Sequence, residues 1–155
     1  MDEPDAPVPL RPSSLRVLVS DRQAEPLAGV TRRALASLAE RTLAEEGVTS
    51  GELSLSFVDP GEIEDLHVRF LGEPGPTDVL SFPMDGEDGL LGDVVVCPEV
   101  AGRNNPDPTS EVRLLVVHGV LHLLGYDHQE EDERVRMWAR QERYSGTPGV
   151  PDGAP

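Results

Sequence analysis

Three histidines in the C-terminal part of the chain have the spacing of a metal site. His118, His122 and His128 fall within eleven residues, in the pattern H-x-x-x-H-x-x-G-x-x-H. Two residues four apart in a helix lie one turn apart on the same face, so the first two imidazoles can reach a single ion. Gly125 fits the positive-φ position that ends a helix, which allows the chain to turn and bring His128 to the same ion. The pattern predicts three nitrogen ligands and a fourth position open to water.

The ligand set favours zinc and a hydrolytic reaction. Imidazole also suits copper, iron and nickel, but three protein ligands plus water are typical of hydrolytic zinc sites. Such an ion lowers the pKa of its bound water from ~15.7 to about 7 and thereby creates a nucleophile at neutral pH. The surrounding segment consists largely of Val and Leu, where unpaired imidazoles would be costly to bury. We therefore predict one Zn²⁺ per chain rather than three histidines that merely pack in the core.

The same spacing occurs in metzincin proteases, but this chain lacks their general base. Those proteases carry a glutamate directly after the first histidine. The corresponding residue here is Gly119. A metzincin-like zinc hydrolase without this base remains an alternative at this point, and Gly119 argues against it.

The motif more closely resembles the YbeY family, a family of zinc-dependent endoribonucleases of ribosome maturation with the hallmark HGxLHLxGYDH. That hallmark is intact from His118 to His128. Two further blocks also resemble the family: Pro76-Thr77-Asp78-Val79-Leu80-Ser81-Phe82-Pro83 and Leu91-Gly92-Asp93-Val94-Val95-Val96-Cys97. The resemblance covers about residues 15 to 144.

This resemblance implies a function and a set of partners. It implies a single-strand-specific endoribonuclease that hydrolyses RNA phosphodiesters with a metal-activated water, in 16S rRNA 3′-end processing and ribosome quality control. The implied partners are rRNA and ribosomal subunits, with ribosomal proteins as further candidates, and the implied compartment is the cytoplasm. No membrane or DNA partner is expected. The alternative is a non-catalytic ribosome-assembly factor whose metal only stabilises the fold.

Four residues outside the histidine set are candidates for the site. The family usually has a phosphate-binding arginine in the helix before Pro76, and that position is Leu71 here, so Arg69 is the nearest substitute. Ser81 lies in a segment that the resemblance places beside the cleft, where it would face the substrate. Asp127 is the carboxylate nearest to the ligands and can act as a base or orient an imidazole. Arg113 can reach phosphate or form a surface ion pair.

Composition limits the possible classes of protein. The formal net charge is −16, and all 13 basic residues are arginine, which disfavours nonspecific binding to nucleic acid. Clustering of the acidic residues leaves room for a local groove lined by arginine. The single cysteine, Cys97, excludes an intramolecular disulfide and fits a reducing compartment. No run approaches the ~20 apolar residues of a membrane span.

The expected elements give one α+β domain over residues 14–144, with flexible segments at 1–13 and 145–155. Alternating or apolar runs predict strands at 15–20, 52–58, 77–82 and 90–97. Helices are expected at 26–46, 60–71, 98–103, 108–124 and 130–144. Phe70 and Val135 are expected to pack inward on the second and the last of these helices. We therefore predict a mixed sheet of about four strands covered by helices, with the metal site on a helix beside the sheet.

Overall fold

A computed structural model describes residues 14–75, 77–84, 89–126 and 131–146 of the chain. Its strands are β1 (Ser14–Asp21), β2 (Ser50–Phe57), β3 (Val79–Pro83) and β4 (Leu90–Val96). They form one sheet in the order β1-β2-β4-β3, in which β1, β2 and β4 are parallel and β3 is antiparallel to β4. The predicted α+β fold with a four-stranded mixed sheet is therefore confirmed.

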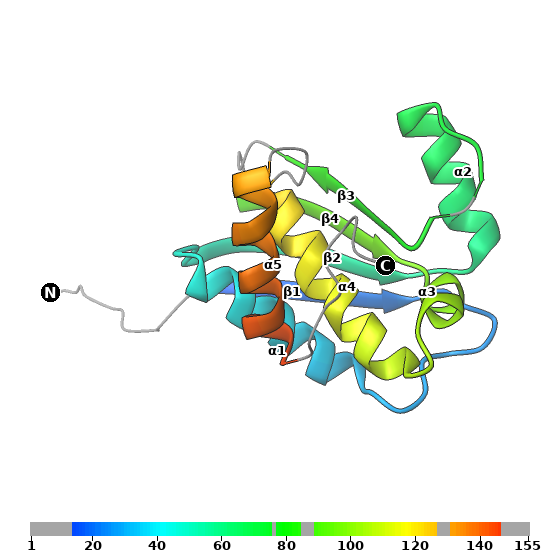
Figure 1. Cartoon of the computed structure of the whole chain (residues 1–155), viewed down its shortest axis with the longest axis horizontal. Helices are drawn as coiled ribbons and strands as arrows, with labels where there is room; N and C mark the ends of the chain where they lie inside the picture. The colour runs from blue at the N-terminus through cyan, green and yellow to red at the C-terminus, as the bar shows by residue number, and fades with distance from the viewer. Residues whose placement is uncertain (1–13, 76, 85–88, 127–130, 147–155) are drawn as a thin grey trace, which may run out of the picture.

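Helices cover the two faces of the sheet unequally (Figure 1). On one face, α1 (Arg32–Glu45) and α4 (Pro108–Leu123) pack on the strands, and α5 (Glu131–Ser145) packs against both helices. Beside β3 stands α2 (Pro60–Leu71), while α3 (Pro98–Asn104) follows β4. No helix in the described part of the chain is long and apolar enough to cross a membrane.

Alternation along the strands produces two cores. Leu53, Leu55 and Phe57 of β2 face α1 and α4, and all three are fully buried in the larger cluster. On the opposite face of the sheet, Leu80 of β3 and Val95 of β4 join a smaller cluster with Ile63 of α2. This period of two fixes which face each strand residue lines. The helix that carries the histidines packs on the more extensively covered face.

The first helix begins later than the sequence suggests. We expected it to start at Pro26, but it starts at Arg32, after the N-cap Thr31, whose hydroxyl accepts a hydrogen bond from the Ala34 N–H at 3.0 Å. Gly29 has a φ of 82°, which a right-handed helix cannot contain. The Asp21 carboxylate also accepts from the Leu27 N–H at 2.9 Å. These local bonds hold the segment before Thr31 as a loop.

Two residues expected to pack inward are exposed. The expectation for Phe70 is wrong: it is 58% exposed near the end of α2, where its ring contacts Phe82 at the edge of the sheet, with the ring centroids 5.4 Å apart. Val135 on α5 is 61% exposed. The buried stripe of that helix is instead Met137, Gln141 and Ser145. The choice of Val135 is therefore wrong, and the polar Gln141 at the centre of the buried stripe gives no hydrophobic signal.

Candidate metal centre

Helix α4 places two of the three predicted ligands together. It begins at Pro108, after the N-cap Asp107, whose carboxylate accepts from the Ser110 N–H at 3.3 Å. Sixteen residues carry the chain to Leu123, with His118 and His122 in the last two turns. The two ring centroids lie 5.9 Å apart, with the rings inclined at 59°. The predicted same-face arrangement of this pair is present.

A side chain from α5 orients the first imidazole. Nδ1 of His118 lies 2.8 Å from Oε1 of Gln141, which is only 2% exposed. Because a carbonyl oxygen can only accept, Nδ1 is the donor in this contact, and in the neutral ring the lone pair is then on Nε2. A buried hydrogen-bond partner on the opposite nitrogen is typical of histidines that bind metal. The donor set therefore fits a divalent ion such as zinc.

Gln141 was not predicted from the sequence, although a signal for it exists. It lies four residues after the buried Met137 and four before the buried Ser145, on the face of α5 that meets α4. A polar residue in the middle of a helix stripe that faces the core needs a hydrogen-bond partner. The His118 imidazole supplies that partner.

Gly119 allows α4 to lie directly on the sheet. A Cβ atom at this position would be 2.5 Å from Cγ1 of Val94 and 3.2 Å from Cγ2 of Val79. Such distances are far inside the normal contact range for carbon atoms. A glutamate at position 119, as in the metzincins, would therefore point into the core. This geometry excludes the metzincin arrangement.

Ser81 contacts the same helix. Its hydroxyl donates to the Gly119 carbonyl at 2.8 Å, so the bond ties β3 to α4 one residue from the first histidine. The structure thus brings Ser81 close to the site, with its hydroxyl hydrogen engaged in that bond. The hydroxyl oxygen remains a possible acceptor.

The chain leaves α4 through the predicted glycine turn. Gly125 has a φ of 106°, and the Tyr126 N–H donates to the Leu121 carbonyl at 3.1 Å. Asp127 and the third predicted ligand, His128, lie outside the described residues. Within the described residues, no group of three or more His, Cys, Asp or Glu side chains is placed to hold a metal ion. The third ligand therefore stays a prediction.

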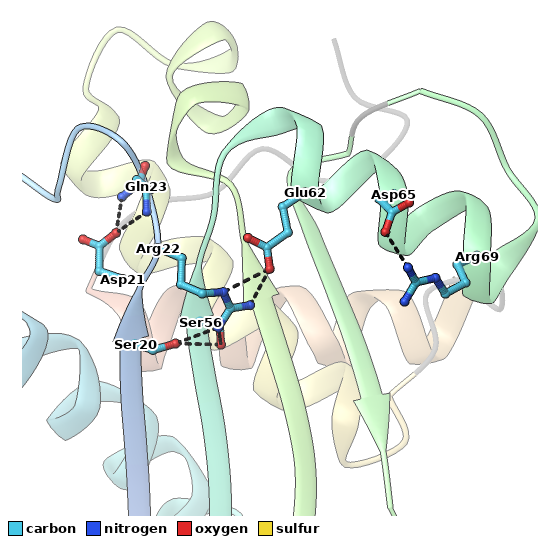
Figure 2. A network of polar contacts seen from close by, with 8 residues as sticks. All are labelled: Ser20, Asp21, Arg22, Gln23, Ser56, Glu62, Asp65 and Arg69. Atoms are coloured by element: carbon cyan, nitrogen blue, oxygen red, sulfur yellow. Dashed lines mark hydrogen bonds and ion pairs between the residues drawn. The ribbon is translucent and has the colours of Figure 1, made fainter.

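The two candidate arginines differ in their surroundings. Arg69 is exposed on α2 and donates to Asp65 at 3.0 Å, as Figure 2 shows, and both side chains are 63% exposed. Arg113 is partly buried on α4, and its guanidinium donates to the Ser145 carbonyl at 3.0 Å. The Arg113 guanidinium thus connects α4 to the end of α5. Arg69 lies on α2, the helix expected from the sequence, which stands beside β3.

A second polar network, which Figure 2 shows, lies on the sheet face that points away from α1 and α4. Arg22, after β1, donates to Glu62 of α2 at 2.6 Å and to the Ser20 hydroxyl at 3.1 Å. A groove of about 640 Å³ opens beside this network, lined by residues that include Phe70 and Phe82. Neither described histidine of the motif lines this groove.

Comparison with known proteins identifies the family. The sequence profile described as "Endoribonuclease YbeY" matches residues 19–147. A protein named endoribonuclease YbeY from Thermobifida fusca is 51% identical over 104 residues, which cover 58% of this chain and 67% of that protein. The Streptomyces coelicolor protein of the same name is 44% identical over 130 residues, which cover 72% of this chain and 79% of that protein.

A solved structure shares the fold. The solution structure of TM1509 from Thermotoga maritima aligns with a TM-score of 0.54 and 29% sequence identity. The alignment covers 83% of this chain and 86% of that protein. The extent of the profile match and the shared motifs agree with this likeness, and the chain belongs to the endoribonuclease YbeY family.

Proposed function

We propose that the protein is a zinc-dependent endoribonuclease that hydrolyses phosphodiester bonds in single-stranded RNA. One zinc ion per chain would be held by His118, His122 and His128. The observation that carries this proposal is the pair of histidines on one face of α4, with His118 oriented by the buried Gln141. Relatives named endoribonuclease YbeY support the reaction type.

The protein's own residues would prepare the site for this chemistry. When bound, zinc would supply a Lewis acid and an activated water for attack on phosphorus. Gln141 holds the His118 ring by its Nδ1–H, which leaves Nε2 as the ligand atom. Gly119 brings the helix close to β4, so that both histidines stand on a rigid support. We propose that Asp127 orients an imidazole or accepts a proton.

Arg69 is our candidate for the contact with the substrate phosphate. Its ion pair with Asp65 is exposed on both sides, and such pairs contribute little stability, so breaking the pair to bind phosphate costs little. Arg113 would have to give up its bond to the Ser145 carbonyl, which supports a structural role for it. Ser81 can offer only its oxygen to a substrate without losing its bond to α4.

The proposed substrate is ribosomal RNA, in particular the 3′ end of the 16S precursor in the cytoplasm. The family resemblance supports this choice. A chain with a formal net charge of −16 attracts free RNA weakly. We therefore propose that ribosomal subunits, including their proteins, present the RNA and supply the positive charge that this chain lacks.

The test compares the metal ligand with a histidine outside the motif. Wild type, His118→Ala and His67→Asn are purified, and each is assayed for zinc content and for cleavage of one labelled RNA as a single strand and as a duplex. His67 is a matched control because its ring contacts the loop after α2, with Nδ1 3.0 Å from the Gly75 carbonyl oxygen. We expect His118→Ala to lose both zinc and cleavage, and His67→Asn to keep both.

Two outcomes would overturn the proposal. Cleavage that persists in His118→Ala without zinc would separate the reaction from the metal. If the wild type binds zinc and assembles with ribosomal subunit precursors but cleaves neither free nor assembled RNA, the protein is a non-catalytic assembly factor.

A further inference from the structure

One carboxylate joins three segments beside the metal motif. Glu46 is the C-cap of α1, and its side chain is 11% exposed. Its Oε1 accepts from the Tyr126 hydroxyl at 2.7 Å, and its Oε2 accepts from the Tyr144 hydroxyl at 2.5 Å and from Nε of Arg140 at 3.2 Å. The partners lie 80 to 98 residues later in the chain. We call this group of four residues the Glu46 clamp.

The clamp places a negative charge where an isolated one would be unfavourable. The C-terminus of a helix carries a partial negative charge, and a shielded carboxylate also loses hydration. Burial by itself raises the pKa of Glu46, but the hydrogen bonds from Tyr144 and Tyr126 and the charge of Arg140 lower the pKa below its ordinary value. The carboxylate is therefore ionised at neutral pH. Hydrogen bonds to a charged acceptor are among the strong ones in proteins.

Tyr126 is the member of the clamp that belongs to the metal motif, the segment from His118 to His128. Its backbone N–H donates to the last turn of α4, its ring packs against the main core, and its hydroxyl donates to Glu46. The Arg140 guanidinium lies 5.6 Å from the ring centroid, which adds a cation–π contact. Tyr126 is thus fixed at its backbone, its ring and its hydroxyl.

A backbone hydrogen bond carries this constraint to a ligand. The Tyr126 N–H donates to the carbonyl of Leu121, the residue directly before His122 in the last turn of α4. A fixed Tyr126 therefore stabilises the helical turn from which the His122 imidazole projects. Fixing a ligand before it binds reduces the ordering cost of metal capture.

We propose that Glu46 is a positioning residue of the metal centre, which acts by holding Tyr126 and thereby the last turn of α4, which carries His122. This inference rests on the zinc site proposed above. Glu46 touches neither metal nor substrate in this arrangement. Its contribution is to metal affinity, through the position of His122 at the end of α4.

The test measures zinc affinity and apoprotein stability separately. Tyr126→Phe removes one oxygen and keeps the ring, so the core packing of the ring is preserved. Zinc dissociation constants are measured by competition with a chelator, and melting temperatures are measured on metal-free protein. We expect zinc binding to weaken by about 10-fold or more in Tyr126→Phe and in Glu46→Ala, the range found when residues that support metal ligands are replaced.

The neighbouring glutamate is a matched control. Glu45 also links α1 to α5, through a pair with Arg143 at 3.4 Å, but its side chain is 55% exposed and its partner lies on α5 rather than in the motif from His118 to His128. Glu45→Gln should bind zinc within about 2-fold of wild type, because an exposed pair contributes little. Glu46→Gln keeps an oxygen that can accept from Tyr126, so it should bind zinc more tightly than Glu46→Ala.

The outcomes separate this inference from the proposed function. If the wild type binds zinc but Tyr126→Phe and Glu46→Ala bind it equally well, with only the apoprotein melting temperature lowered, the Glu46 clamp is a structural brace and the inference is wrong. Equal weakening in Glu45→Gln would also overturn it, because the effect would then be general. If the wild type itself binds no zinc, the proposed metal site fails together with this inference.

Discussion

Replacing Gly119 by alanine should destabilise the protein, although alanine is the better helix former. Its Cβ would lie 2.5 Å from Cγ1 of Val94, 3.2 Å from Cγ2 of Val79 and 3.4 Å from the Ser81 hydroxyl oxygen. Carbon atoms normally approach to about 3.5 Å, so Val94 or α4 must move by roughly 1 Å. Val94 has a short β-branched side chain and is fully buried on β4, which is an interior strand of the sheet. Neither the Val94 side chain nor α4 can therefore move easily to make room for the added methyl group.

The expected cost follows from two opposing effects. Overpacking of a core costs about 1–3 kcal/mol, and two short contacts to stiff valines put this substitution in the upper half of that range. The gain from replacing glycine in a helix is up to about 1 kcal/mol. The net loss in the free energy of unfolding is therefore about 1–2 kcal/mol, which lowers the melting temperature by roughly 2–8 °C for a domain of this size.

Gly61 provides the matched control for thermal melting measured by circular dichroism. It lies in the first turn of α2, and a Cβ atom there would meet nothing within 4 Å. Gly61→Ala should be neutral or slightly stabilising, whereas Gly119→Glu, the metzincin residue, should prevent folding. A melting temperature for Gly119→Ala equal to or above that of wild type would refute the close packing of α4 on the sheet.

Three further predictions concern single side chains. Burial and the Glu46 carboxylate raise the pKa of Tyr144 to about 12 from 10.0. The Tyr144 phenol thus stabilises the fold fully below about pH 10 and loses this contribution as the pH rises through about 12. A spectrophotometric titration of Glu46→Gln should show a lower pKa for Tyr144 than in the wild type. Gln141→Ala should weaken zinc binding about 10-fold, because the His118 ring loses its orienting acceptor; unchanged affinity would contradict that role. Arg69→Gln should change stability by less than about 0.5 kcal/mol in urea unfolding while raising the KM for RNA, and an unaltered KM would remove Arg69 from the site.

The local features of the metal helix were predictable because they depend on neighbours in sequence. Asp107 and Pro108 start α4, Gly125 ends it, and a spacing of four places His118 and His122 on one face. The strand pattern likewise follows from a period of two, so the four-stranded sheet could be expected. The interpretation of Gly119 from the motif also agrees with the packing that the structure shows.

Other features depend on contacts that no local pattern contains. Glu46 and Tyr126 are 80 residues apart, and Gln141 lies 23 residues after His118. Neither pairing has a sequence signal that identifies the partner. Phe70 continues the apolar stripe of α2, but that helix reaches the edge of the sheet, where nothing covers the ring fully. Helical periodicity thus indicates the direction of a side chain without showing whether a neighbour is present.

Titration of metal-free protein with zinc tests the central claim most directly. The chelator-treated wild type would be given zinc stepwise, and the rate of cleavage of a single-stranded RNA would be measured at each step, with ribosomal subunit precursors as a second substrate. The proposed site predicts that the rate rises in proportion to zinc and levels off at one equivalent per chain, with no rise in His118→Ala. Full cleavage by the metal-free protein, or a rise of the same size in His118→Ala, would contradict it.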